Sequence, residues 1–230
     1  MARVLQFALS NPVAGLESQF NEWYGGPHLQ HGLLTPGILA GQRFRRQNGP
    51  WPAGKHDYLM IWEMDDPAFT LAELAKVKGS DHMPISPAID MAGVQPPTMW
   101  RRAKVWNGSR PTTPSESRGP VVLALYKAAA GQDQDLQQSL LQGGLAQLAD
   151  LPEVVSAEYL TLADEQIRGN ARKYPHGLLI ELQATNSSLA ALDGQITPVP
   201  YADKDHWFAA LFAPLAERLT HPQAAHEATP

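Results

Sequence analysis

The sequence predicts an α+β fold in which two similar halves, each with the element order β-α-β-β-α-β of the ferredoxin-like unit, pack into one barrel. Two observations carry this prediction. A segment rich in Pro, Ser, Thr and Gly divides the 230-residue chain into parts of similar size. Strand and helix patterns also succeed one another in the same order on both sides of it. We therefore expect repeat 1 at residues 1–106, a linker at 107–120, repeat 2 at 121–220 and a flexible tail at 221–230.

The first half opens with a strand at Arg3–Ser10, where large apolar residues alternate with small or polar ones at a period of two. Apolar residues from Leu16 to Trp23 recur at helical spacing, and the break Gly25–Pro27 ends that helix and starts another. Pro and Gly residues divide the rest of this half into a helix at Pro67–Val77 and strands at Ile38–Arg46, Tyr58–Glu63 and Pro97–Trp106.

The second half repeats this order more loosely. A strand at Val121–Ala128 precedes a helix at Asp133–Ala149, which Gly143-Gly144 interrupts. Residues Trp207–Leu219 suit either a helix or a strand by periodicity, and we assign a strand because the repeat requires one. The other expected elements are strands at Val154–Leu162 and Gly177–Gln183 and a short helix that Asn186 caps and that ends at Leu192.

Composition excludes several classes of protein. The net charge is −5, and the basic residues cluster only at Arg43–Arg46 and Arg101–Lys104. Because a nucleic-acid binder concentrates Lys and Arg along a phosphate track, we expect no nucleic-acid partner. The chain has no cysteine, which excludes disulfides, zinc–thiolate sites and cysteine nucleophiles. With no apolar stretch suited to a membrane span or a signal peptide, we expect a soluble, cytoplasmic protein with no membrane partner.

Residues 21–28, Asn-Glu-Trp-Tyr-Gly-Gly-Pro-His, are followed by the turn Pro36-Gly37 and by Arg43-Phe44 on the next predicted strand. This pattern resembles the dimeric α+β barrel superfamily and, within it, the EthD-like proteins. The resemblance implies a barrel of two four-stranded sheets, closed by two chains or by tandem halves of one chain, with a pocket between sheets and helices. Members include cofactor-free monooxygenases, cyclases, isomerases, dehydratases and haem enzymes, so the fold suggests a site without identifying a reaction.

The chain departs from its relatives at the residue before the histidine. Many of them have an acidic residue there, where this chain has Pro27. If that acid orients the histidine in relatives, this chain either orients His28 in another way or does not use His28 as they do. The second half has Ala146 and Gln147 in its corresponding helix and no histidine. A single functional site is accordingly expected in the first half.

The candidate catalytic residues all lie in that half. His28 and His31 are three residues apart on one helical face, and histidine titrates near neutral pH, which suits a general acid or base. A polar helix face is the alternative interpretation of this pair. Tyr24 offers a hydroxyl to a substrate carbonyl. Asp81 and His82 lie in a loop longer than its turn requires, which is typical of lids and binding loops, although an ordinary surface role also fits them.

Alternation along the barrel strands predicts which side chains face the interior. With Leu59 and Ile61 placed against the helices, we expect an interior that suits a flat, partly apolar ligand, a filled core being the alternative. The predicted interior side chains are Tyr58, Met60, Trp62, Leu179, Glu181, Gln6, Ser10 and one of Gln42 and Arg43, with Leu178, Ile180 and Leu182 against helices. The predicted substrate-binding residues are Trp23, Arg43, Tyr58, Met60, Trp62 and Glu181.

These residues predict a cofactor-free enzyme that transfers protons on a small aromatic or polyketide-like molecule. Its reaction is of lyase, dehydratase, cyclase or isomerase type, with His28 as general acid or base. The alternatives are a non-catalytic small-molecule-binding or stress-response barrel and a haem- or metal-dependent oxidoreductase. Beside His28 and His31, a metal would need a third ligand such as His82, His56 or Asp81. We therefore expect no metal, and we expect no other cofactor. The expected partners are the substrate and, in a homodimer, a second chain.

Overall fold

The computed structural model describes residues 3–50, 55–77, 79–80, 83–93, 97–107, 117–166, 173–184, 189–196 and 199–221. The first half contains β1 (Val4–Ser10), α1 (Glu17–Trp23), η1 (Tyr24–His28), α2 (Leu29–Leu33), β2 (Ile38–Arg46), β3 (Tyr58–Met64), α3 (Pro67–Val77) and β4 (Thr98–Asn107). The second half contains β5 (Val121–Ala128), α4 (Asp133–Ser139), η2 (Leu140–Gly144), α5 (Leu145–Ala149), β6 (Val154–Leu162), β7 (His176–Leu182), α6 (Ala190–Ile196), β8 (Ala202–Pro214) and β9 (Leu219–Thr220).

This order confirms the two β-α-β-β-α-β repeats. The bounds of β2, α3, β5 and β6 are those the sequence predicted, and the ambiguous C-terminal segment is the strand β8. Asn186, residues 108–116 of the expected linker and residues 222–230 of the expected tail lie outside the described residues.

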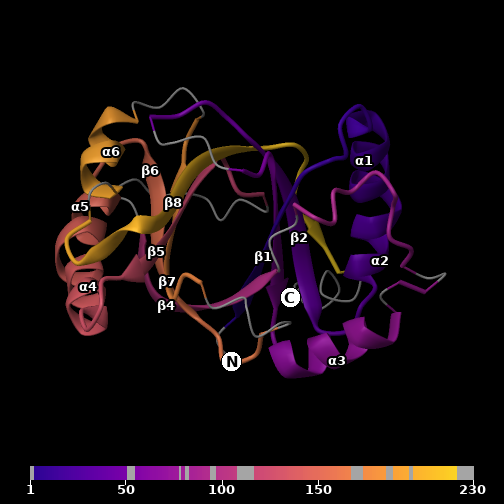
Figure 1. Cartoon of the computed structure of the whole chain (residues 1–230), viewed down its shortest axis with the longest axis horizontal. Helices are drawn as coiled ribbons and strands as arrows, with labels where there is room; N and C mark the ends of the chain where they lie inside the picture. Colours follow the sequence, from indigo (N-terminus) through magenta and orange to yellow (C-terminus); the bar gives the residue numbers. More distant parts are fainter. Residues whose placement is uncertain are drawn as a thin grey trace, which may run out of the picture.

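The strands of the described chain form one closed barrel. Their order is β3-β1-β4-β6-β7-β5-β8-β2, every neighbouring pair is antiparallel, and β2 pairs again with β3, while β9 adds to β2. The halves meet at two seams, β4 with β6 and β8 with β2. The helices of the first half cover one side of the barrel and those of the second half the other (Figure 1). The barrel therefore closes within one chain, a point that the sequence left open.

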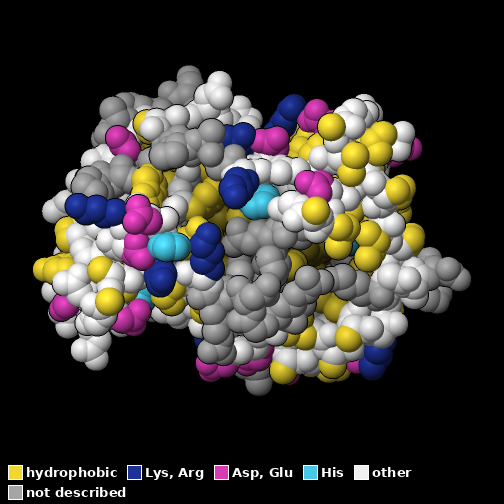
Figure 2. Space-filling view, in the orientation of Figure 1, with side chains coloured by type: hydrophobic (Ala, Val, Ile, Leu, Met, Phe, Trp, Pro, Cys, Tyr) yellow, Lys and Arg dark blue, Asp and Glu magenta, His cyan; other side chains and the backbone are white. Residues whose placement is uncertain are grey.

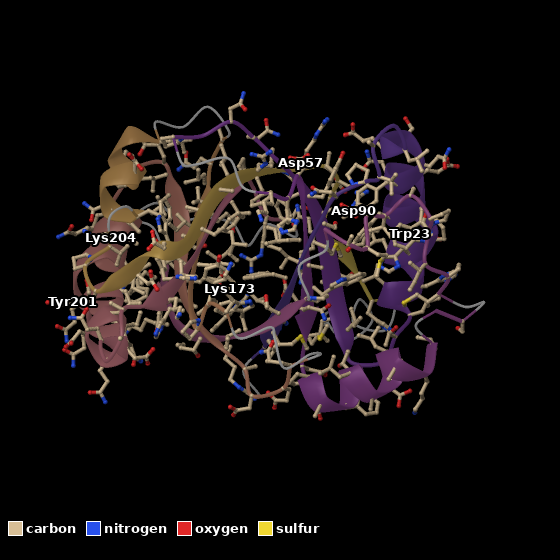
Figure 3. All side chains as sticks on the ribbon, in the orientation of Figure 1. Trp23, Asp57, Asp90, Lys173, Tyr201 and Lys204 are labelled. Carbon is tan, nitrogen blue, oxygen red and sulfur yellow. The ribbon has the colours of Figure 1, made fainter. Side chains whose placement is uncertain are left out.

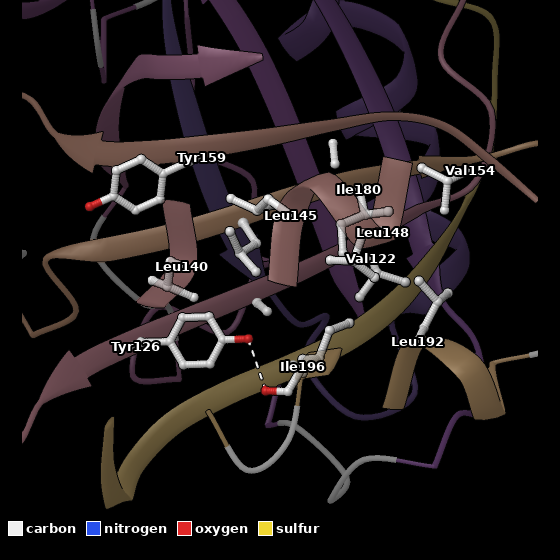
Figure 4. Close-up of a cluster of buried hydrophobic side chains, with 14 of the residues drawn as sticks. Val122, Tyr126, Leu140, Leu145, Leu148, Val154, Tyr159, Ile180, Leu192 and Ile196 are labelled. Atoms are coloured by element: carbon white, nitrogen blue, oxygen red, sulfur yellow. Dashed lines mark hydrogen bonds between the residues drawn. The ribbon is translucent and has the colours of Figure 1, made fainter. Parts of the chain in front are cut away.

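Three apolar clusters fill this architecture. The barrel interior holds side chains of both halves, including Phe7, Ile61, Trp100 and Phe212. A second cluster lies between the strands of the first half and their helices. The third lies between β5–β8 and α4–α6, where Tyr126 donates a hydrogen bond to the Ile196 carbonyl among aliphatic side chains (Figure 4). The barrel interior is therefore largely filled by apolar side chains of both halves.

The predicted facing of β3 is wrong. Leu59 and Ile61 lie in the barrel interior, and Tyr58, Met60 and Trp62 face the helices. The helix side has room for the Trp62 indole because a Cβ at Gly32 would lie 2.3 Å from its Cη2, and a Cβ at Gly41 would lie 2.7 Å from its ring. Glycine at both positions therefore seats the large ring on this face.

For the other strands, the predicted facing of the side chains is wrong in some cases and confirmed in others. On β1 the interior residues are Leu5, Phe7 and Leu9, so alternation puts Gln6 and Ser10 on the helix side, against the prediction. The prediction is confirmed for Leu178, Ile180 and Leu182, which lie against helices, and for Leu179, which lies inside. Gln42 shares the interior face of β2 with Phe44, which turns Arg43 toward the helices.

The first long helix of each half changes to a π-helical turn at the same place. Segments of 7, 5 and 5 residues succeed one another as α1, η1 and α2 and again as α4, η2 and α5. In η1, Gly26 has φ −104° and ψ −106°, outside the helical region, and Pro27 follows it. Proline lacks the N–H of a regular helix, so the chain kinks here and re-aims the side chains on either side. None of the described helices is long and apolar enough to cross a membrane.

Candidate functional site

Five predicted site residues meet between the α1–η1 segment and the strands β2 and β3, and we call this group the aromatic–arginine layer: Trp23, Tyr24, His28, Arg43 and Tyr58. The His28 ring lies 4.3 Å from the Trp23 ring and 4.7 Å from the Tyr24 ring, measured between centroids. The π-helical turn produces this arrangement because it brings His28 back against the helix that precedes it. The histidine is therefore held between two aromatic rings at the edge of the buried layer.

Arg43 is the charged centre of the layer. Its side chain rises from β2, is 6% exposed, and lies over the Tyr24 ring with 4.6 Å between Cζ and the centroid. Nη2 donates to the Asn21 side-chain oxygen at 2.9 Å, and Nη1 donates to the Asn21 backbone carbonyl at 3.3 Å. Gly25 lets the backbone approach, since a Cβ there would lie 3.2 Å from Nη1.

No carboxylate forms an ion pair with Arg43 in the described part of the chain. A buried cation is costly unless it is paired, so this guanidinium relies on neutral acceptors and ring faces. The layer thus holds positive charge where a bound anion would find little competition.

The environment shifts the pKa of both members of the Arg43–Tyr24 contact. Burial lowers the pKa of Arg43, and the nearby Tyr24 and Tyr58 oppose that shift. Burial raises the pKa of Tyr24 to about 12, with Arg43 acting in the opposite direction. At neutral pH Tyr24 is therefore a neutral phenol, which can donate a hydrogen bond to an anionic oxygen.

Tyr58 anchors the layer to α1. Its hydroxyl donates to the Glu17 carboxylate and accepts from Asn21 Nδ2 at 3.1 Å. Burial and the bond to Glu17 raise the pKa of Tyr58. Glu17 is also paired with Arg45 at 2.9 Å. Since its hydroxyl has two partners, Tyr58 offers a ligand its ring rather than its oxygen.

His31 lies on a cavity of about 340 Å³ beside the layer. The cavity is lined by His31, Leu34, Thr35, Pro36, Glu73, Val77 and Met83. The Nδ1 atom of His31 is buried and has no hydrogen-bond partner among the described residues. His31 therefore borders the cavity, while its Nδ1 is withheld from solvent.

The segment after residue 82 packs against this region. Met83 lines the His31 cavity, and the Trp23 indole donates to the Pro84 carbonyl at 3.1 Å. The same segment is tied back to the β1–α1 connection by a bond from Val13 N to the Ala88 carbonyl at 2.8 Å. The second part of this loop therefore contacts Trp23 and the His31 cavity. Asp81 and His82 lie outside the described residues.

An apolar rim borders this loop. Val13, Ile85 and Met91 are between 37% and 52% exposed. In the space-filling view, hydrophobic side chains gather over the α1 side, and charged ones gather toward β8 (Figure 2). Trp23 and Asp90 lie on the α1 side of the barrel, whereas Tyr201 and Lys204 lie at its opposite side (Figure 3). The surface beside this loop is thus apolar, which suits contact with an aromatic ligand.

The predicted site residues do not all come together. Trp62 and Met60 share the face of the layer but pack beneath Gly32 and Gly41. Glu181 lies at one end of the barrel, where it accepts from Gly119 N at 2.8 Å. Across the described residues no group of three or more His, Asp or Glu is arranged to hold a metal ion.

Sequence reasoning missed two groups of polar residues. Asn21 belongs to the motif at residues 21–28, but only the facing of Arg43 shows that its amide holds the guanidinium. In the second half, His176 lies between Tyr159, with 2.7 Å from Nδ1 to the hydroxyl, and Asp133, with 3.0 Å from Nε2 to the carboxylate. One signal in the sequence pointed to that chain of contacts, namely a histidine at the first position of a buried strand.

No family model matches the sequence, and no curated protein matches it. Several solved structures share the fold. An anthrone oxidase-like protein aligns over 96% of this chain and 94% of its own, with a TM-score of 0.62 and 9% identity. A provisionally assigned monooxygenase from Fusobacterium nucleatum aligns over 95% and 97%, with a TM-score of 0.60 and 9% identity. A haem-binding protein from Thermus thermophilus aligns over 98% and 94%, with a TM-score of 0.51 and 10% identity.

At such identities the likeness establishes the fold and nothing finer. The chain has a mixed α+β barrel of the dimeric α+β type, built here from tandem halves.

Proposed function

We propose that the aromatic–arginine layer is the site of a cofactor-free enzyme that removes a proton from a small, flat aromatic or polyketide-like substrate. One observation carries the proposal. Arg43 is a buried cation with no carboxylate partner among the described residues, and it lies over the ring of Tyr24, which His28 also contacts. Such a cation stabilises negative charge that develops on a substrate oxygen, and a low-dielectric layer strengthens the effect.

Each residue has a separate part in this chemistry. His28 accepts a proton from a carbon next to a carbonyl, which leaves an enolate. Arg43 and the neutral hydroxyl of Tyr24 stabilise the enolate oxygen. The ring of Trp23 stacks on the planar substrate. His31, which lines the neighbouring cavity, is the candidate to return the proton at another position.

Returning the proton elsewhere gives isomerisation, and expelling a neighbouring hydroxyl as water gives dehydration. Attack of the enolate on a second carbonyl of the same chain gives cyclisation. These are the lyase and isomerase classes that the sequence predicted. All of them share the first deprotonation, which is the step the layer supports.

An oxygenase is the second candidate, favoured by the neighbours that bear the names monooxygenase and anthrone oxidase-like. In that reaction the carbanion gives its electrons to O2 to form a carbon–oxygen bond and, after protonation, a hydroperoxide. Loss of water from the hydroperoxide leaves a ketone. This path uses the same base and the same oxyanion contacts.

The haem alternative fits the described residues poorly. His31 is the candidate axial ligand because its Nδ1 lacks a hydrogen-bond partner within the described chain. The cavity beside it, about 340 Å³, is near the lower limit for small-ligand pockets and is too small for a porphyrin. We derive no step through haem, and an absorbance scan of the purified protein for a haem band tests this assignment.

The EthD-like relationship belongs to the same proposal. It rests on the motif at residues 21–28, of which Asn21 and Tyr24 contact Arg43 and His28 contacts Tyr24. Alignment of sequences that share this motif provides the test: they should keep a basic residue at the position of Arg43.

The decisive experiment compares Arg43→Met with Arg45→Met. Arg45 lies two residues along β2, is half-exposed and pairs with Glu17. Proton removal is followed as deuterium incorporation from D2O into anthrone and related enolisable polycyclic phenols, without oxygen. Arg43→Met should lower the exchange rate by about 10²–10³-fold, as loss of an oxyanion donor does, and Arg45→Met by less than about threefold. Equal rates for the two variants would remove Arg43 from the mechanism.

The same assay separates the rivals. Exchange without oxygen uptake in air supports the isomerase or lyase form, and stoichiometric oxygen uptake supports the oxygenase. Saturable binding of these compounds with neither exchange nor uptake indicates a non-catalytic binding protein.

A further inference from the structure

A second cavity, of about 720 Å³, lies at one end of the barrel and draws its lining from both halves. We call it the barrel-end cavity. Its lining residues are Arg3, Glu63, Arg102, Val105, Asn107, Ser117, Arg118, Gly119, Val155, Ser156, Glu158, Glu181, Leu182, Gln183 and Arg218. It shares no residue with the aromatic–arginine layer, and the function proposed above does not use it.

The polar lining follows the repeat. Glu63 pairs with Leu5 across β3 and β1, and Glu181 pairs with Val121 across β7 and β5, so the two carboxylates occupy matching positions. Their strands bring them to the same end of the barrel. Glu158 on β6 adds a third carboxylate, with its side chain 6% exposed.

Four arginines meet these three carboxylates. Arg118 approaches Glu158 at 3.0 Å and Glu181 at 3.8 Å, and its side chain is 11% exposed. Arg102 approaches Glu158 at 2.7 Å. Arg218 Nε donates to Glu63 at 3.1 Å, and Arg3 reaches the same carboxylate at 3.6 Å.

Glu63 and Arg118 are both charged at neutral pH despite their burial. Burial alone would raise the pKa of Glu63, but Arg118, Arg218 and Arg102 together bring it below its usual value. Burial would lower the pKa of Arg118, yet its three carboxylate neighbours raise it. The lining therefore carries one positive charge in excess, four guanidinium groups against three carboxylates.

The arginines also supply more donors than the carboxylates can satisfy. Each guanidinium has about five N–H groups and no acceptor, so four of them carry about twenty donors, whereas three carboxylates offer about twelve acceptor positions. Ion pairs withdrawn from water are costly, and aliphatic side chains would fill a barrel end more stably, as they do in the interior just below. Retaining four arginines around an open volume points to a ligand rich in acceptor oxygens.

We propose that the barrel-end cavity binds a small organic molecule that carries phosphate or carboxylate groups. Planar guanidinium groups bind such groups with two parallel hydrogen bonds. Arg3, whose side chain is 55% exposed, and Arg102 are the arginines placed to meet the ligand first. Glu63 and Glu158 compete with the ligand for the same donors, so they tune its affinity.

Calorimetric titration of the full chain with pyrophosphate and with citrate tests the proposal at low ionic strength. At least one probe should bind with one-to-one stoichiometry, and the better probe identifies the favoured anion. Arg102→Gln should weaken binding by about tenfold or more, the cost of one charged hydrogen-bonding partner. Glu158 keeps Arg118 as its partner in that variant, so the fold is retained.

Arg101→Gln is the matched control. Arg101 precedes Arg102 on β4, points to the opposite face and pairs with Glu165 at 2.7 Å. Glu63→Gln should tighten binding several-fold because it removes a competing carboxylate. Absence of saturable binding by both probes, an equal loss in Arg101→Gln, or weaker binding in Glu63→Gln would each overturn the proposal.

Discussion

In each half of the barrel the first helix contacts a strand at a corresponding place. The side chains that make this contact differ between the halves. In the first half Glu17, at the start of α1, accepts from Tyr58, at the start of β3. In the second half Asp133, at the start of α4, contacts His176, at the start of β7. A carboxylate on the first helical turn thus ties the helix to the strand in both halves.

The halves differ in what lies next to that contact. The first half has the cationic Arg43 on β2, whereas Tyr159 on β6 bonds to His176 in the second half and is wholly buried. The helices differ in the same sense. The cluster beneath the helices of the first half is rich in rings, and the cluster beneath those of the second half contains Leu136, Leu140 and other aliphatic residues around Tyr126. The first half therefore places a cation among aromatic rings, whereas aliphatic side chains predominate in the core of the second half. Together with the proposed function, this comparison assigns catalysis to the first half and the stabilisation of the fold to the second.

Replacing His28 gives the largest expected change. His28→Ala should lower kcat/KM by about 10²–10⁴-fold, the usual loss of a general base. His176→Ala should leave kcat/KM within about threefold although it breaks the contact with Asp133. Steady-state rates on the substrate found by the exchange assay provide the measurement. Full activity in His28→Ala, or a comparable loss in His176→Ala, would break the assignment of one role to each half.

Truncation in the second core should separate stability from activity. Leu178 on β7 is 1% exposed in the aliphatic cluster. Leu178→Ala should lower the free energy of unfolding by about 2–5 kcal/mol, as other buried leucines do, while kcat/KM is unchanged. The counterpart Met60→Ala, on the layer face of β3, should lower both quantities. Denaturant unfolding followed by fluorescence measures the first, and an activity loss in Leu178→Ala would mean that the cores are coupled.

The pH dependence of stability gives the smallest effect. The pKa of Tyr24 is raised from 10.0 to about 12, so between those two values the unfolded chain loses this proton and the folded chain keeps it. Stability should therefore fall as pH rises through that range, by up to about 1.4 kcal/mol per pH unit for this group.

Tyr24→Phe should remove that part of the slope, as measured by urea unfolding at a series of pH values. Tyr126 and Tyr159, whose pKa values burial also raises, keep their share in the variant. An unchanged slope would show that Tyr24 is exposed to solvent in the folded protein.

The sequence predicted the fold well because period-two and helical patterns are local signals. The bounds of the strands at Ile38–Arg46 and Val154–Leu162 could be predicted from the residues of each strand and of the turns beside it. The residues of the layer were largely predicted as well, because Asn21–His28 is one contiguous motif and Arg43 lies on the next strand.

The facing of β3 could not be derived in the same way. Both faces of Tyr58–Met64 carry large side chains, and all seven residues are buried, so no polar alternation distinguishes them. The choice depends on Gly32 and Gly41, which are distant in sequence and make space for Trp62 on one side. The ion pair of Glu181 with Arg118 could not be predicted either, since Arg118 comes from the segment before β5 rather than from a strand beside it.

The two seams inside a single chain also affect how this protein behaves on dilution and how it evolves. A barrel assembled from two chains opens when those chains dissociate on dilution, whereas this barrel is closed by strands of one chain and its closure does not depend on concentration. In a symmetric pair every substitution appears twice around the axis. In this chain a substitution appears once, so Arg118 can face the carboxylates of the barrel end without a copy of itself opposite.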